Sequence, residues 1–194
     1  MKPHVAILIS GRGSNMEALV KAAQAPDFPA EIALVVSDKP EAAGLEIARA
    51  LGVEALAVPA RPYGKDREAH ERAIDAALVE RDIQLICLAG YMRLLTPWLV
   101  QRWAGRMLNI HPSLLPAFPG LNTHARALAA GVTEHGCTVH LVTEGMDEGP
   151  ILGQARVPVL PDDDEARLAA RVLAQEHLLY PETLAKLAQK KSAA

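Results

Sequence analysis

The sequence contains few aromatic residues, two cysteines and no apolar run long enough to cross a membrane. Aromatic side chains make up 4% of the 194 residues, so alanine, leucine, valine and isoleucine must build most of the core. Cys87 and Cys137 lie in apolar or strand-like segments, where free buried thiols are expected rather than a disulfide framework. The apolar stretch Val5 to Ile9 is too short for a membrane span or a signal sequence. We therefore expect a cytoplasmic protein.

An excess of basic residues is also lacking. The 20 Lys and Arg residues are outnumbered by 23 Asp and Glu residues, which gives a formal net charge of −3. Because nucleic-acid-binding domains usually carry a basic excess, we expect small-molecule partners, with no nucleic acid and no membrane. The length fits a single domain over residues 1–189 with a frayed tail at 190–194, in a monomer or a homodimer.

Short apolar segments alternate with amphipathic ones in the first half of the chain. This order predicts an α/β fold with a mostly parallel sheet flanked by helices. Strands are predicted at 5–9, 32–36, 55–58, 83–89 and 107–110, and helices at 16–25, 40–52, 67–79 and from Thr96-Pro97 onward, with Thr96 as the N-cap.

The second half has a different pattern. Two extended segments, 137–142 and 150–159, are joined by the turn-rich segment 143–149, which predicts a C-terminal hairpin appended to the sheet. The acidic residues at 162–165 favour the start of a helix that runs towards Tyr180, because acidic side chains suit a helix N-terminus.

A glycine-containing loop, Ser10 to Asn15, follows the first predicted strand and precedes a helix. We refer to these six residues as the phosphate loop. Glycines allow tight turns, and the amides of a helix N-terminus together with Ser14 can donate to an anion. The loop has neither the third glycine of a dinucleotide fingerprint nor the Lys-Ser/Thr pair of a P-loop. The spacing is compatible with a site for one phosphate or with an ordinary strand-to-helix turn.

The segment Leu108 to Ser113 carries the strongest indication of catalysis. Asn109 and His111 lie at the end of a predicted strand, where ligands bind in open α/β sheets, and residues two apart on a strand point to the same side. An amide can donate to an oxygen that becomes negative, and an imidazole can carry a proton near neutral pH. The proline-rich segment 111–120 that follows is stiff and is expected to line a small-molecule site.

A carboxylate is the third expected member of this site. Asp147 lies in the loop between the two hairpin strands, and on spacing alone Glu148 is an equally good candidate. His135, His140 and His177 match no standard zinc spacing, and His140 falls in the middle of a strand, where a structural hydrogen bond is expected. We therefore predict no metal.

With these motifs in order, the sequence resembles the phosphoribosylglycinamide formyltransferase family, the folate-dependent glycinamide ribonucleotide transformylases of purine biosynthesis. The resemblance covers nearly the whole chain and is carried by ISGRGSN, LAGYMRLL, LNIHPSLLPAFPG, GCTVHLVTEGMDEGP and AQEHLLYP. It implies a Rossmann-like formyltransferase fold and transfer of a formyl group from 10-formyltetrahydrofolate to the amine of 5'-phosphoribosylglycinamide. The sequence departs from other members at Arg12, and at Asn122, where some members have histidine.

The resemblance also implies roles for individual residues. Asn109 would stabilise the oxyanion, His111 would act as general acid and base, and Asp147 would pair with His111. The nucleotide substrate would contact Gly13, Ser14, Asn15 and Glu176. The folate would contact Arg67, Met92, Arg93, Leu94, Leu95, Thr143, Glu144, Gly145 and Met146.

Three alternatives share parts of this pattern. A methionyl-tRNA formyltransferase is expected to carry a further C-terminal domain and a basic surface, and a formyltetrahydrofolate deformylase is expected to carry a further N-terminal domain and a different residue at the position of Pro112. A non-catalytic nucleotide-binding module would keep the phosphate loop without needing Asn109, His111 and Asp147 together.

Overall fold

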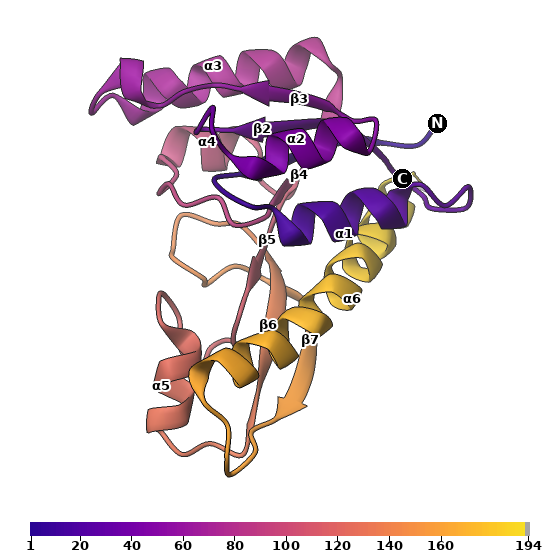
Figure 1. Ribbon diagram of the computed structural model, residues 1–194. Coiled ribbons are helices and arrows are strands. Elements are labelled where there is room, and N and C mark those ends of the chain that lie inside the picture. The colour runs from indigo at the N-terminus through magenta and orange to yellow at the C-terminus, as the bar shows by residue number, and fades with distance from the viewer. Residues whose placement is uncertain (193–194) are drawn as a thin grey trace.

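The computed structural model describes residues 1–192, which form a seven-stranded sheet with helices on both faces (Figure 1). The strand order is β3-β2-β1-β4-β5-β6-β7. The strands are β1 (His4–Ile9), β2 (Glu31–Ser37), β3 (Glu54–Ala57), β4 (Ile83–Leu88), β5 (Met107–His111), β6 (Glu134–Leu141) and β7 (Ile151–Pro158). The helices are α1 (Ser14–Ala23), α2 (Ala43–Ala50), α3 (Arg67–Glu80), α4 (Pro97–Arg102), α5 (Thr123–Ala129) and α6 (Glu165–Ser192), with a short 3₁₀ helix at Arg61–Tyr63.

Strands β1 to β5 are parallel, whereas β6 pairs antiparallel with both β5 and β7. The α/β fold, the mostly parallel sheet and the appended hairpin predicted from the sequence are therefore confirmed. Because β1, β4 and β5 are parallel neighbours, the loops that follow them open at the same edge of the sheet.

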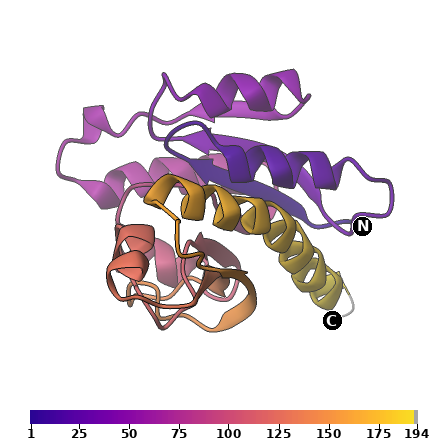
Figure 2. The ribbon, with the colours of Figure 1, turned by 60° about the horizontal axis from the view of Figure 1, so that its bottom comes forward.

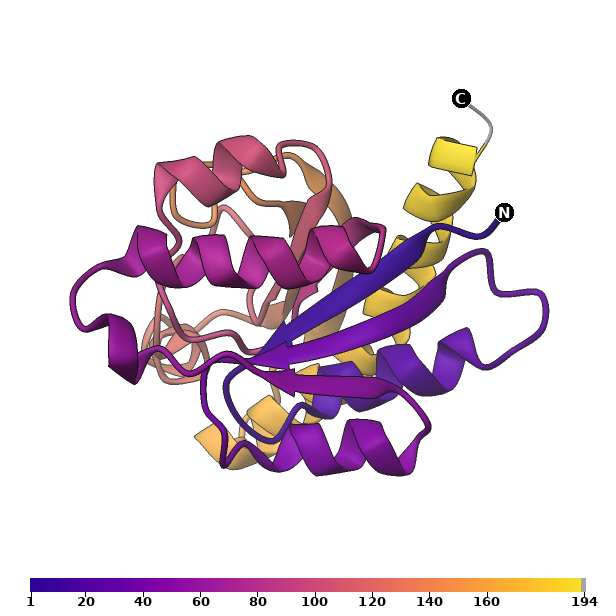
Figure 3. The same ribbon diagram turned by 90° about the horizontal axis from the view of Figure 1, so that it is seen from above.

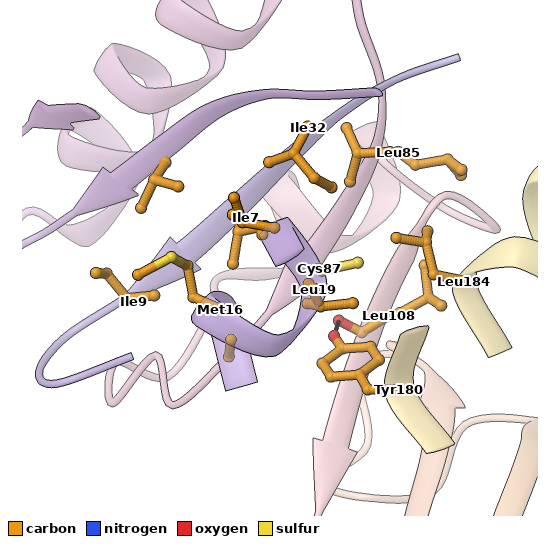
Figure 4. Packing of buried hydrophobic residues seen from close by; sticks show 14 of the residues in the cluster. Ile7, Ile9, Met16, Leu19, Ile32, Leu85, Cys87, Leu108, Tyr180 and Leu184 are labelled. Carbon is orange, nitrogen blue, oxygen red and sulfur yellow. Dashed lines mark hydrogen bonds between the residues drawn. The ribbon is translucent and has the colours of Figure 1, made fainter. Parts of the chain in front are cut away.

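Alternate residues of β1 enter two separate cores. Val5, Ile7 and Ile9 pack with residues of α1, α2 and α6, whereas Ala6 and Leu8 pack with residues of α3 and α4. Figure 3 shows these two groups of helices on opposite faces of the sheet. All five side chains are fully buried, as expected for a central parallel strand. Figure 4 shows Tyr180 of α6 next to Leu108 and Cys87 in the first of these cores.

Three helices differ from the sequence-based expectations. Helix α2 begins at Ala43 rather than at Pro40, and α5 was not anticipated. Helix α6, expected to run towards Tyr180, continues past Pro181 to Ser192, because Leu184 and Ala188 beyond the proline are fully buried. The expected frayed tail at 190–194 is thus helical up to residue 192, and its last two residues lie outside the described residues.

Helix α6 crosses the molecule from the hairpin to the parallel half of the sheet (Figure 2). Leu168 and Val172 near its start pack with Cys137 of β6 and Val157 of β7. In the described part of the chain, no helix combines the length and the apolar character that a membrane span requires.

Candidate active site

Two adjacent strands and one loop bring four polar side chains together. Asn109 and His111 belong to β5, and in the antiparallel register Asn109 lies directly opposite His140 of β6. Side chains of directly opposed residues in an antiparallel pair are close neighbours. The loop that follows β6 returns over these residues and contributes Asp147, whose backbone has a φ of 55°.

The carboxylate of Asp147 contacts both histidines. Its Oδ2 lies 3.4 Å from His111 Nδ1, and its Oδ1 lies 3.8 Å from His140 Nε2. The backbone N–H of Gly120 donates to Asp147 Oδ2 at 2.9 Å, which joins this loop to the proline-rich segment. The expected pairing of His111 with Asp147 is therefore present in the geometry, whereas the side chain of Glu148 folds back over Gly145.

Both ring nitrogens of His111 face oxygen acceptors. Its Nε2 lies 2.9 Å from the carbonyl oxygen of Phe118, so this nitrogen carries a hydrogen and donates it. Its Nδ1 faces Asp147, which can accept a second hydrogen. The site can therefore satisfy an imidazolium at both nitrogens, as a group that accepts and returns a proton requires.

His140 also belongs to this site, although its position in the middle of a strand predicted only a structural hydrogen bond. That bond exists, because His140 Nδ1 lies 3.0 Å from the carbonyl oxygen of Leu141. Burial lowers the pKa of His140, which favours the neutral ring, and the bond to the Leu141 carbonyl places the hydrogen of that ring on Nδ1. Its Nε2 lies 3.4 Å from Asn109 Nδ2 and is free to accept from that amide, which orients Asn109.

The proline-rich segment is fixed to the hairpin by hydroxyl groups. Thr138 of β6, which lies opposite His111, donates from Oγ1 to the Ser113 carbonyl at 2.7 Å and accepts from the Leu115 N–H at 3.1 Å. Ser113 Oγ in turn donates to the Ala117 carbonyl at 2.6 Å. These bonds hold the segment that supplies the Phe118 carbonyl and the Gly120 amide to the site.

The phosphate loop lies against the start of α2. Gly13 has a φ of 70°, a left-handed conformation that favours glycine, and it directly precedes α1. The N–H of Gly44 donates to the Gly11 carbonyl at 3.0 Å. A Cβ atom on Gly44 would lie 2.4 Å from Ile9 Cδ1 and 3.0 Å from the Gly11 oxygen, so only glycine fits at this position of α2.

Asn15 and Glu176 meet beside this loop. Burial raises the pKa of the Glu176 carboxyl to about 7, and a hydrogen bond from the Asn15 side chain opposes part of that rise. Asn15 Oδ1 is buried and has no hydrogen-bond partner among residues 1–192. An unpaired buried acceptor next to a carboxyl that can hold a proton is suited to the hydroxyl groups of a sugar.

The segments expected to contact folate expose apolar side chains. Met92, Leu94 and Met146 are 68%, 64% and 57% exposed, respectively. Arg67 lies at this segment, because its Nη1 donates to the Leu94 carbonyl at 3.1 Å. Thr96 is the N-cap residue of α4, as expected, but its side chain donates to the buried carboxylate of Glu71 and not to the helix.

The remaining expected folate contacts lie in the loop after β6. Val142, at the start of this loop, packs in the same hydrophobic cluster as Leu95. Glu144 Oε1 accepts from Gln101 Nε2 of α4 at 2.8 Å. Thr143, Gly145 and Met146 follow on the same loop, and Arg93 lies between Met92 and Leu94. Within residues 1–192, no group of three or more His, Cys, Asp or Glu side chains is arranged to hold a metal ion.

Residues 3–184 match the family model described as "Formyl transferase". The chain is 43% identical over 178 residues to the phosphoribosylglycinamide formyltransferase of Escherichia coli (strain K12), covering 92% of this chain and 84% of that protein. It is 45% identical over 188 residues to the trifunctional purine biosynthetic protein adenosine-3 of Drosophila melanogaster, covering 96% of this chain. It spans only 14% of the length of that trifunctional protein.

The comparison with solved structures points to the same family as these relatives. The crystal structure of phosphoribosylglycinamide formyltransferase from Brucella melitensis is 59% identical, with a TM-score of 0.92 and coverage of 97% of this chain and 96% of that one. The likeness therefore extends over the whole sheet, including the antiparallel hairpin and α6. The chain belongs to the formyl transferase family and, within it, to the phosphoribosylglycinamide formyltransferases.

Proposed function

We propose that this protein transfers the formyl group of 10-formyltetrahydrofolate to the amine of 5'-phosphoribosylglycinamide in purine synthesis. The observation that carries the proposal is the cluster of Asn109, His111, His140 and Asp147 at the same sheet edge as the phosphate loop. Strands β1 and β5 are separated by β4 alone, so their ends are about 10 Å apart at the usual strand spacing. A phosphorylated ribose carrying a glycinamide arm can bridge that gap.

The nucleotide would bind with its phosphate on the phosphate loop. The amides at Gly13, Ser14 and Asn15 would donate to the phosphate oxygens. Asn15 Oδ1 and Glu176 would then face the ribose, and the exposed side chain of Arg12 adds positive charge near the same loop. The amine of the substrate would extend towards the end of β5.

The folate would lie between the segment 92–95 and the loop after β6. Arg67, Met92, Arg93, Leu94 and Leu95 line one side, and Thr143 to Met146 line the other. Burial of the exposed Met92, Leu94 and Met146 side chains by a flat aromatic ligand would stabilise the complex by the hydrophobic effect. No metal is invoked.

In the reaction, the amine nitrogen attacks the formyl carbon and forms a tetrahedral intermediate. Asn109 donates a hydrogen bond to the developing oxyanion, and His111 supports the same charge. The bond between the formyl carbon and the folate nitrogen then breaks. The proton lost by the amine passes to that nitrogen through water, so the products are the formylated nucleotide and tetrahydrofolate.

The decisive experiment follows the absorbance change as 10-formyltetrahydrofolate becomes tetrahydrofolate, with and without phosphoribosylglycinamide. Turnover that requires the nucleotide supports the transferase. Turnover without it would identify a deformylase instead, and no turnover under either condition would favour a nucleotide-binding module. Gel filtration of the same preparation distinguishes the monomer from the homodimer.

A further inference from the structure

Ser10 connects the phosphate loop to the segment proposed to bind folate. It directly follows β1 and is only 4% exposed. Its Oγ donates to Asp38 Oδ1 at 2.6 Å and accepts from the backbone N–H of Met92 at 2.9 Å. A single hydroxyl group therefore bonds to residues that follow two different strands, β2 and β4.

Asp38 sets the direction in which this hydroxyl donates. A serine hydroxyl has one hydrogen and two lone pairs, so it can rotate between partners, whereas an ionised carboxylate only accepts. Asp38 is itself 7% exposed, and its backbone carbonyl accepts from the Ala60 N–H at 3.2 Å, which fixes it after β2. With its hydrogen directed to Asp38, Ser10 Oγ presents a lone pair to Met92.

The segment after β4 depends on such backbone contacts for its position. Arg67 binds the Leu94 carbonyl, and Glu71 accepts from the Thr96 N–H at 2.8 Å. Tyr91 and Leu95 of this segment pack against the core, whereas Met92 and Leu94 expose their side chains, so backbone contacts fix the positions of these two residues. Ser10 supplies the contact on the side of the phosphate loop.

We infer that Ser10 and Asp38 are positioning residues that hold the folate-binding segment in register with the phosphate loop. This inference rests on the proposed function. Ser10 would act through Met92 and would touch neither substrate with its side chain. Its loss should weaken folate binding while the backbone amides of the phosphate loop remain in place.

The first test compares Ser10→Ala with Ser37→Ala. Ser37 is a matched control, because it is also buried at the end of a neighbouring strand and accepts a backbone N–H, that of Lys39 at 3.1 Å. Ser10→Ala should raise the KM for 10-formyltetrahydrofolate about tenfold, since the Met92 N–H loses its acceptor. The KM for phosphoribosylglycinamide should change by less than about twofold, and Ser37→Ala should change neither constant.

The second test uses Asp38, so that the inference does not depend on one variant folding. Asp38→Ala should raise the folate KM in the same way, because the Ser10 hydroxyl can then turn its hydrogen towards Met92. Asp38→Asn should largely restore it, since the amide oxygen can still accept from Ser10. A purely structural role would not produce a folate-specific effect that the conservative variant reverses.

Two outcomes for Ser10 and one for Asp38 would overturn the inference. An unchanged folate KM in Ser10→Ala, or an equal rise in both KM values, would show that Ser10 does not position the folate segment selectively. Equal effects of Asp38→Asn and Asp38→Ala would remove the role assigned to Asp38. Wild-type protein without nucleotide-dependent turnover would reject the proposed function itself, a result that is separate from the variant data.

Discussion

At the scale of single residues, Asn109 and His111 are placed to stabilise the reacting centre. Replacing Asn109 by alanine removes one oriented donor, and we expect kcat to fall by ~10²–10³. His111→Ala should produce a loss of at least the same order, because it removes the imidazole that supports the developing charge and leaves Asp147 without its partner. Initial rates of tetrahydrofolate formation measure both effects.

A matched control for the histidine variant is His4→Ala. His4 is the first residue of β1, so it lies at the amino-terminal end of the parallel strands, whereas the site lies at their carboxyl ends. Its side chain is partly exposed. This substitution should leave kcat within about twofold of the wild-type value. Near-wild-type turnover of Asn109→Ala or His111→Ala in a folded protein would contradict the assignment of the site.

His140 should contribute less to the reaction than these two residues. It acts on Asn109 and faces Asp147 without donating to the substrate, so we expect His140→Ala to lower kcat by about tenfold, short of the ~10²–10³ for a direct oxyanion donor. The KM for phosphoribosylglycinamide should stay nearly constant. A loss as large as that of Asn109→Ala would instead indicate direct contact with the reacting atoms.

His140 also shows why part of the site escapes sequence reasoning. Asn109 and His111 are two residues apart on one strand, so their common direction follows from local geometry. The neighbour of Asn109 on β6 depends on the register of an antiparallel pair, and that register is set by tertiary packing over 31 positions of the chain. Asp147 was assigned through family resemblance, because spacing alone did not separate it from Glu148.

At the scale of elements, the contact between α2 and the phosphate loop requires glycine at position 44. A methyl group there would collide with Ile9 and the Gly11 carbonyl, so Gly44→Ala should displace the loop by a few tenths of an ångström or more. We expect the KM for phosphoribosylglycinamide to rise about tenfold, which corresponds to ~1.4 kcal/mol. Steady-state kinetics with each substrate varied in turn measures this effect.

Ala43→Ser, one residue earlier on the exposed side of α2, is the control for that experiment. Its kinetic constants should match those of the wild-type protein. Equal nucleotide KM values for Gly44→Ala and the wild type would show that the phosphate loop tolerates the displacement.

Helix α6 carries a buried carboxyl that should make stability depend on pH. The folded-state pKa of Glu176 is about 7, above its ordinary value of 4.5. Between these values the unfolded chain has released a proton that the folded chain still holds, so stability falls as pH rises from about 4.5 to 7. Glu176→Gln should remove this loss, which amounts to roughly 3 kcal/mol at most.

Urea unfolding gives the free energy of unfolding of the wild type and of Glu176→Gln at pH 5 and at pH 8. The effect is the change in the difference between the two proteins from one pH to the other. The variant should gain stability relative to the wild type at the higher pH. Glu182→Gln, an exposed carboxylate of the same helix, is the control. A wild-type-minus-variant difference that is the same at both pH values would show that Glu176 ionises normally in the fold.

The length of α6 illustrates the limit of local rules for elements. Proline inside a helix removes a hydrogen bond and costs about 3 kcal/mol, and the sequence pattern predicted the helix only as far as Tyr180. The helix continues because Tyr180, Leu184 and Ala188 lie on one face and are fully buried in the core with α1 and β1. That burial is a tertiary effect, and it outweighs the local cost.

At the scale of the whole molecule, α6 joins the two halves of the sheet. Its first turns pack on the hairpin and α5, whereas Leu184 and Ala188 pack against α1 and the parallel strands. Tyr180 lies where the two regions meet, and its hydroxyl faces the Leu88 carbonyl at 2.9 Å and the Leu108 carbonyl at 3.2 Å. The hydroxyl thereby bridges β4 and β5 beneath the proposed site.

This bridge predicts that Tyr180→Phe weakens the whole domain as one unit. The loss of a buried donor to two carbonyls should lower the free energy of unfolding by ~1–2 kcal/mol. Trp98 belongs to α4 and Trp103 directly follows it, and both pack with the core on this face of the sheet. The fluorescence of the two tryptophans therefore reports the parallel half, while circular dichroism reports all helices and strands. In urea the two signals should shift together in the variant. A shift seen by circular dichroism with unchanged tryptophan fluorescence would mean that the hairpin and α6 unfold separately, and that Tyr180 does not couple the two halves.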